Sequence, residues 1–153
     1  MKLLQRFASL TVALLFCTST LAADAKPVGW LFVHTAKSAE MTRDKTLVMP
    51  VTRDIFAFTD RPNRLHGYLN AHEFVSMWKG KGDTFRGDPP NAVLTWVTDM
   101  TIKEAQVVVA NATVTDDGRS ISYEVAFEAG DYLKSSMDGV SLFIEGLIPP
   151  PNY

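Results

Sequence analysis

Three histidines are the residues of this chain best suited to binding a metal ion. His66 and His72 lie close together in the sequence, and His34 lies in an apolar run upstream. Imidazole nitrogens bind zinc and copper together with carboxylate or thioether groups. Residues that could complete such a site are Asp60, Glu73, Met41, Met49 and Met77. The spacing matches no established metal site, so metal binding by His66 and His72 is our alternative hypothesis, and we predict no cofactor.

A polar turn with two arginines is the second group that could bind a ligand. Asp60, Arg61, Asn63 and Arg64 surround Pro62. Arginine and asparagine side chains can hold a carboxylate or another anion. The same residue types also stabilise turns by bonding to the backbone, so a purely structural turn is the other interpretation. We name Asp60, Arg61, Asn63 and Arg64 as the expected contact with a ligand or a protein partner.

The sequence contains no complete catalytic pattern. His72 and Glu73 begin the zinc-protease pattern His-Glu-x-x-His, but Ser76 occupies the position of the second histidine. No Gly-x-Ser-x-Gly segment is present, and nothing in the sequence places a base and an acid beside a serine. We therefore expect no catalytic residues, and a hydrolase is the third hypothesis.

Residues 1–25 have the features of a secretory signal peptide. A positively charged start and the apolar segment 10–16 precede small residues that suit cleavage after position 22, 23 or 25. The apolar segment is shorter than the roughly 20 residues that a membrane span requires. The only cysteine, Cys17, leaves with this peptide, so the mature chain can form no disulfide. We expect export to the periplasm or the medium, with no transmembrane segment in the mature chain.

The charge balance argues against a nucleic-acid partner. The 153 residues include 15 Lys and Arg and 17 Asp and Glu, for a formal net charge of −2, with both signs interspersed. Domains that bind nucleic acid typically carry a basic patch. The length suits a single domain, which we place at residues 26–148, followed by an extended tail at 149–153. The expected partner is another exported protein or a small ligand.

Short strands are the main elements expected to position these residues. Runs rich in β-branched and aromatic residues, bounded by turn residues, predict them. The predicted strands are 28–35, 39–42, 46–51, 55–59, 92–98, 104–115, 119–128 and 140–145. About seven or eight strands at this spacing favour a single antiparallel β-sandwich, with a closed barrel as the alternative topology.

One short helix is predicted near residues 71–79. Asn70 is a favourable N-cap, Glu73 completes a capping box, and Leu69 with Phe74 fits a hydrophobic staple. Glycines beyond residue 79 end the helix. Its apolar side predicts that it packs over one end of the β-core.

The clearest pairing signal joins residues 104–115 to residues 119–128 through Asp117 and Gly118, which are typical of a type I′ turn. With that turn, apolar residues oppose one another on one face and polar residues on the other. The predicted apolar pairs are Val114–Ile121, Ala112–Tyr123, Ala110–Val125 and Val108–Phe127. The predicted polar pairs are Thr115–Ser120, Thr113–Ser122 and Asn111–Glu124. Val107 and Val109 fall on the polar face under this register.

Three segments carry a resemblance to known sequences. Residues 30–36 are Trp-Leu-Phe-Val-His-Thr-Ala, residues 58–64 are Phe-Thr-Asp-Arg-Pro-Asn-Arg, and residues 88–92 are Asp-Pro-Pro-Asn-Ala. With the helix between the last two, they resemble a family of small exported bacterial proteins that has no assigned function. The resemblance covers most of the chain after the signal peptide and implies export and one compact domain. Our leading expectation is a non-enzymatic exported binding or structural protein.

Overall fold

The structure is a computed structural model that describes residues 28–80 and 84–151. The predicted signal peptide, residues 1–25, lies outside the described residues, as does the end of the predicted tail, residues 152–153. Within the two described ranges, no helix has the length and apolar character needed to cross a membrane.

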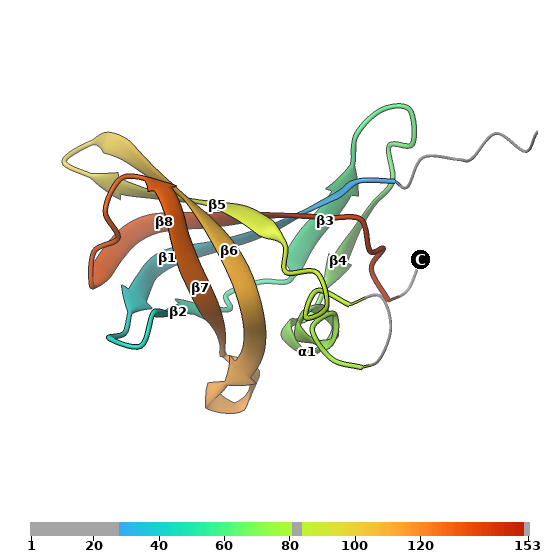
Figure 1. Cartoon of the computed structure of the whole chain (residues 1–153), viewed down its shortest axis with the longest axis horizontal. Helices are drawn as coiled ribbons and strands as arrows, with labels where there is room; N and C mark the ends of the chain where they lie inside the picture. Colours follow the sequence, from blue (N-terminus) through green and yellow to red (C-terminus); the bar gives the residue numbers. More distant parts are fainter. Residues whose placement is uncertain (1–27, 81–83, 152–153) are drawn as a thin grey trace, which may run out of the picture.

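The described chain forms eight strands and one α-helix (Figure 1). Their bounds are β1 Trp30–Met41, β2 Thr46–Pro50, β3 Ile55–Thr59, β4 His66–Leu69, α1 Ala71–Ser76, β5 Asn91–Thr98, β6 Thr101–Thr115, β7 Ser120–Gly130 and β8 Ser136–Gly146. The strands form one sheet in the order β2-β7-β6-β5-β8-β1-β3-β4, and all neighbours pair antiparallel. The predicted β-rich, antiparallel fold with one helix is confirmed.

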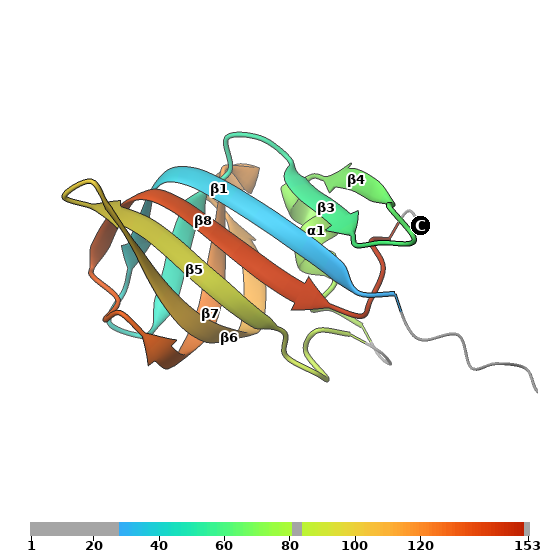
Figure 2. The ribbon, with the colours of Figure 1, turned by 90° about the horizontal axis from the view of Figure 1, so that it is seen from above.

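The predicted β-sandwich is wrong, because the sheet closes on itself. β2 pairs with β7 on one side and with the end of β1 on the other, which closes a six-stranded barrel. β3 and β4 extend the sheet from the start of β1 (Figures 1 and 2). The 12-residue β1 is long enough to pair with β3 at its start and with β2 at its end. Strands alternate between buried and exposed residues in sandwiches and barrels alike, so the strand pattern does not separate the two topologies.

The turn between β6 and β7 is centred on the predicted residues, in a loop of residues 116–119 where Asp116 also has a positive φ angle of 54°. Asp117 and Gly118 have φ angles of 51° and 88°, and both central residues of a type I′ turn require positive values. The Arg119 amide donates to the Asp116 carbonyl at 3.0 Å. The local sequence therefore determines this turn.

The register of this hairpin follows the prediction near the turn and departs from it further along. The confirmed pairs are Thr115–Ser120, Val114–Ile121, Thr113–Ser122, Ala112–Tyr123 and Asn111–Glu124. Beyond Asn111 the register shifts, so the predicted pairs Ala110–Val125 and Val108–Phe127 are wrong and are replaced by Val109–Val125 and Val107–Phe127. This β-bulge buries Val107 and Val109 completely and leaves Ala110 exposed. The shift places the larger apolar side chains inside the barrel.

The helix α1 begins at the predicted residue and has the predicted cap. The Asn70 side chain accepts from the amides of His72 and Glu73, each at 3.0 Å, and the Glu73 carboxylate accepts from the Asn70 amide at 2.9 Å. The helix ends at Ser76, although backbone bonds of the i→i+3 type continue to Lys79. It packs against β4, β6 and β7 and covers one end of the barrel, as predicted (Figure 1).

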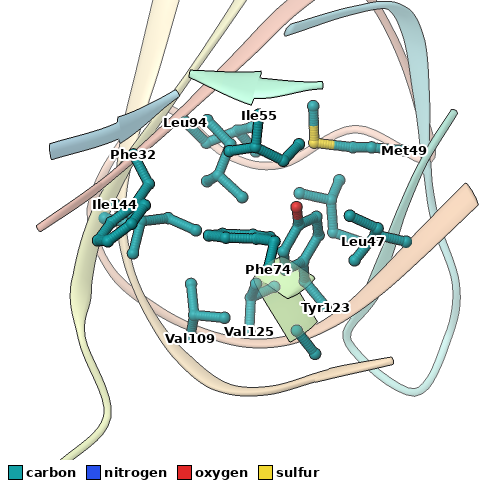
Figure 3. Packing of buried hydrophobic residues seen from close by; sticks show 14 of the residues in the cluster. Phe32, Leu47, Met49, Ile55, Phe74, Leu94, Val109, Tyr123, Val125 and Ile144 are labelled. Atoms are coloured by element: carbon teal, nitrogen blue, oxygen red, sulfur yellow. The ribbon is translucent and has the colours of Figure 1, made fainter. Parts of the chain in front are cut away.

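Phe74 of α1 lies in the middle of the core (Figure 3). It is fully buried, and its ring centroid lies 5.7 Å from that of Phe32, 6.4 Å from that of Tyr123 and 5.3 Å from that of Trp78. The Trp78 indole nitrogen donates to the carbonyl of Val109 on β6 at 3.2 Å. Aromatic packing and this hydrogen bond hold the helix against the barrel.

Gly130→Ala is expected to destabilise the protein by about 1–3 kcal/mol. Gly130 has a φ angle of 103°, and a Cβ atom there would lie 2.5 Å from the carbonyl oxygen of Glu104 in the neighbouring strand. Chemical denaturation would measure the loss. Gly29→Ala is the matched control, because a Cβ atom at Gly29 has no heavy atom within 4 Å. Equal stability of the two variants would contradict the prediction.

Candidate functional site

A pocket of about 590 Å³ opens at the end of the barrel where β1 and β5 begin and β8 ends. Its walls come from the start of β1, the end of β3, the loop before β5, and the end of β8 with the residues after it. These parts of the chain lie side by side in Figure 2. The antiparallel pairing explains this arrangement, because Trp30 of β1 pairs with Thr59 of β3 and with Gly146 of β8. Each of the three segments that carry the sequence resemblance contributes to the walls.

The floor of the pocket is aromatic and belongs to the core. Trp30 and Phe85 line the pocket, and both are buried. The Phe85 ring packs edge-on against Trp78 with centroids 4.9 Å apart, and it lies 5.8 Å from Phe32. The Phe85 amide also donates to the carbonyl of Met77 at 2.9 Å. The packing that holds α1 therefore also preforms this floor, which suits an apolar group of a ligand.

The rim of the pocket is acidic. Asp60, Asp88 and Glu145 line it, together with the carboxamide of Asn91, and all four side chains are exposed. No lysine, arginine or histidine is among the described residues that form its walls. The backbone amide of Arg61 donates to the Asp60 carboxylate at 2.6 Å, which orients that side chain. An apolar floor with a negative rim favours ligands that combine apolar and cationic groups.

The predicted contact turn is only partly in this pocket. Asp60 lies on the rim, whereas Arg61, Asn63 and Arg64 are exposed on the turn between β3 and β4 and do not line the pocket. A backbone bond of 3.2 Å from the Arg64 amide to the Asp60 carbonyl closes the turn. These three residues stay a predicted contact for a partner that reaches beyond the pocket.

The three histidines occupy different parts of the fold. His66 begins β4 beside the Phe56 ring, at a centroid distance of 6.5 Å. His72 lies in the first turn of α1 near Gly118, and His34 is buried on β1. In residues 28–80 and 84–151, no group of three or more His, Cys, Asp or Glu side chains could hold a metal ion. A site built from His66 and His72 stays a prediction.

His34 has two defined partners inside the barrel. Its Nδ1 atom lies 2.8 Å from the hydroxyl of Tyr123, and its Nε2 atom lies 3.1 Å from the carbonyl of Pro50. A carbonyl can only accept, so Nε2–H donates to Pro50 and Nδ1 accepts from Tyr123. Burial lowers the pKa of His34 to about 4, although the bond to Pro50 acts in the opposite direction. His34 is therefore neutral at neutral pH and links β1, β2 and β7 as a structural group.

Burial also raises the pKa of the Tyr123 hydroxyl well above its ordinary value. The hydroxyl consequently keeps its proton and can donate it to His34. Neither side chain of this pair lines the pocket. The pair contributes to closing the barrel and not to the candidate site.

In comparisons with protein-family models, curated proteins and solved structures, no match to this chain was found. The sequence indicated Asp60 but not Glu145, Leu147 and Phe85, because the lining residues lie far apart along the chain. The resemblance segments were the one signal that could have grouped Trp30, Asp60 and the loop before β5.

Proposed function

We propose that this chain is an exported, non-enzymatic binding protein whose ligand occupies the pocket at the start of β1. The preformed aromatic floor beside an acidic rim is the observation that carries the proposal. A ligand entering such a pocket buries apolar surface without a costly rearrangement of the protein. The signal-peptide pattern of residues 1–25 supports export.

The residue types in the pocket favour binding over catalysis. Its described walls contain no serine, threonine, cysteine, histidine or lysine that could act as a nucleophile. The three carboxylates are exposed to water, whereas catalytic carboxyl groups typically lie in buried surroundings that separate an acid from a base. A hydrolase is accordingly the least supported of the three hypotheses.

Leu147→Arg is expected to remove a bound ligand without unfolding the protein. Leu147 lines the pocket and is 63% exposed, so an arginine there would obstruct the pocket while costing little stability. Native mass spectrometry of the mature protein purified from the periplasm would reveal the ligand as added mass. The same experiment would report the signal cleavage position and the oligomeric state.

Met100→Arg is the matched control, because Met100 is 99% exposed at the opposite end of the barrel. The control should keep the added mass. Retention of that mass by Leu147→Arg, or its loss from both variants, would contradict a ligand in this pocket.

The double variant Arg61→Ala and Arg64→Ala tests whether the turn between β3 and β4 contacts the ligand. Weaker binding would extend the site along this turn, and unchanged binding would confine the site to the pocket.

The metal hypothesis has its own test. If His66 and His72 bind zinc or copper, the double variant His66→Ala and His72→Ala must lose a stoichiometric metal signal that the unchanged protein shows in native mass spectrometry. An unchanged signal removes both residues as ligands. The double histidine variant does not alter the walls of the pocket, because neither histidine lines it.

A further inference from the structure

A second hollow of about 280 Å³ continues the pocket along the outer face of the sheet. The two hollows share Leu31, Asn91 and Glu145. From these residues the second hollow extends to Gln106 on β6 and Glu128 on β7. Pocket and hollow together form one groove across β3, β1, β8, β5, β6 and β7, which are consecutive neighbours in the sheet.

The groove is elongated, because the residues that line it come from six neighbouring strands. Five of these strands belong to the closed barrel, so the groove follows a curved wall. A flexible peptide segment can follow such a path. A compact small molecule would occupy only the pocket.

The walls of the groove offer contacts that match a peptide. Leu31, Val93 and Phe143 line the second hollow as half-buried apolar side chains, and Val93 pairs directly with Phe143. Asn91 and Gln106 add exposed carboxamides. A carboxamide can both donate to and accept from a peptide backbone. The groove can therefore bind a main chain and apolar side chains together.

The carboxylates of the groove favour a positively charged ligand. Asp60 and Asp88 lie on the pocket, Glu145 lies where the two hollows meet, and Glu128 lies at the far end. No lysine, arginine or histidine is among the described residues that line either hollow. A cationic ligand would meet carboxylates along the whole path, whereas an anionic ligand would be repelled.

We infer that the ligand of this groove is an extended peptide segment that carries basic side chains between apolar ones. The inference rests on the proposed function and names its ligand class. Apolar contacts with the aromatic floor supply most of the affinity. The exposed carboxylates supply the selectivity, because ion pairs at exposed positions are individually weak.

The test uses the mature protein and three synthetic heptapeptides that differ at three positions. The probe is acetyl-Gly-Lys-Leu-Lys-Phe-Lys-Gly-amide, and the comparison peptides carry glutamine or glutamate in place of lysine. Tryptophan fluorescence, to which Trp30 in the pocket contributes, and calorimetry measure the affinity. The lysine peptide is expected to bind at least about tenfold more tightly than the glutamine peptide at low salt, and the glutamate peptide more weakly than both.

Variants that neutralise single carboxylates test whether the groove causes the preference for the lysine peptide. Glu145→Gln and Glu128→Gln are each expected to weaken binding of the lysine peptide about two- to fivefold and to affect binding of the glutamine peptide less. Glu40→Gln is the matched control, because Glu40 is exposed on β1 outside both hollows. A control that weakens binding as much as the groove variants would overturn the assignment of the effect to this groove.

The other outcomes separate this inference from the proposed function. Equal binding of the lysine and glutamine peptides, abolished by Leu147→Arg, would overturn the charge selection and leave the pocket as a binding site. Failure of all three peptides at millimolar concentration, with a bound mass that Leu147→Arg removes, would overturn the peptide class alone. If no peptide binds and the purified protein carries no bound mass, both the peptide inference and the proposed binding function would be overturned.

Discussion

Phe74→Ala is expected to lower the free energy of unfolding by about 3–5 kcal/mol, the range typical for removing a buried phenylalanine. The Phe74 ring is fully buried and packs against Phe32 of β1, Tyr123 of β7 and Trp78 in the segment that follows α1. Its loss leaves a cavity where the helix meets the core (Figure 3). Urea denaturation followed by circular dichroism would measure the change.

A matched control separates this packing effect from the loss of any large apolar side chain. Met100→Ala removes a side chain that is 99% exposed, so its effect should stay within about 0.5 kcal/mol. A loss below about 1 kcal/mol for Phe74→Ala would contradict the central position of the helix in the core. Since Phe85 in the pocket floor packs on Trp78, Phe74→Ala should also weaken ligand binding.

Acidification from about pH 7.5 to pH 4 is expected to remove about 3 kcal/mol of stability through His34 alone. The pKa of His34 falls from an ordinary value of 6.5 to about 4 in the folded protein because of burial. The unfolded chain therefore binds a proton at this residue before the folded chain does. The contribution of neutral His34 is complete above pH 6.5, decreases as the pH falls below 6.5, and levels off below about pH 4.

The variant His34→Gln tests this prediction through the pH dependence of stability. It should be less stable at pH 7.5, because the bonds to Tyr123 and Pro50 are disturbed, yet it should lose about 3 kcal/mol less than the unchanged protein on acidification. His66→Gln is the control, since it removes an exposed histidine. Parallel stability curves for His34→Gln and the unchanged protein would contradict the assignment.

Local elements of this fold are predictable because neighbouring residues alone stabilise them. Asn70 and Glu73 satisfy the free amides at the start of α1 wherever the helix lies. Asp117 and Gly118 accept the positive φ angles of the hairpin turn whatever packs on the strands. The sequence therefore located both elements correctly.

The candidate site was only partly predictable, because its residues come from separate strand ends. Asp60 stood out in the sequence through its turn, but Glu145 lies at the end of a strand with no local mark of function. The sequence suggested that the arginines beside Asp60 bind an anion, whereas the pocket that Asp60 lines is acidic. Adjacency in the sequence did not imply a shared site.

The sequence divided β1 into two predicted strands and did not predict β4. It did determine most of the other strands, the capped helix, the type I′ turn and the hairpin register next to it. Each of these depends on contacts within a few residues or across one hairpin. Only the tertiary structure decided between sandwich and barrel, placed the bulge beyond Asn111 and assembled the pocket. These features depend on which distant strands become neighbours and on which side chains the enclosed core can accommodate. A strand carries the same alternating pattern in either topology, so that choice is made only when β2 pairs with both β1 and β7.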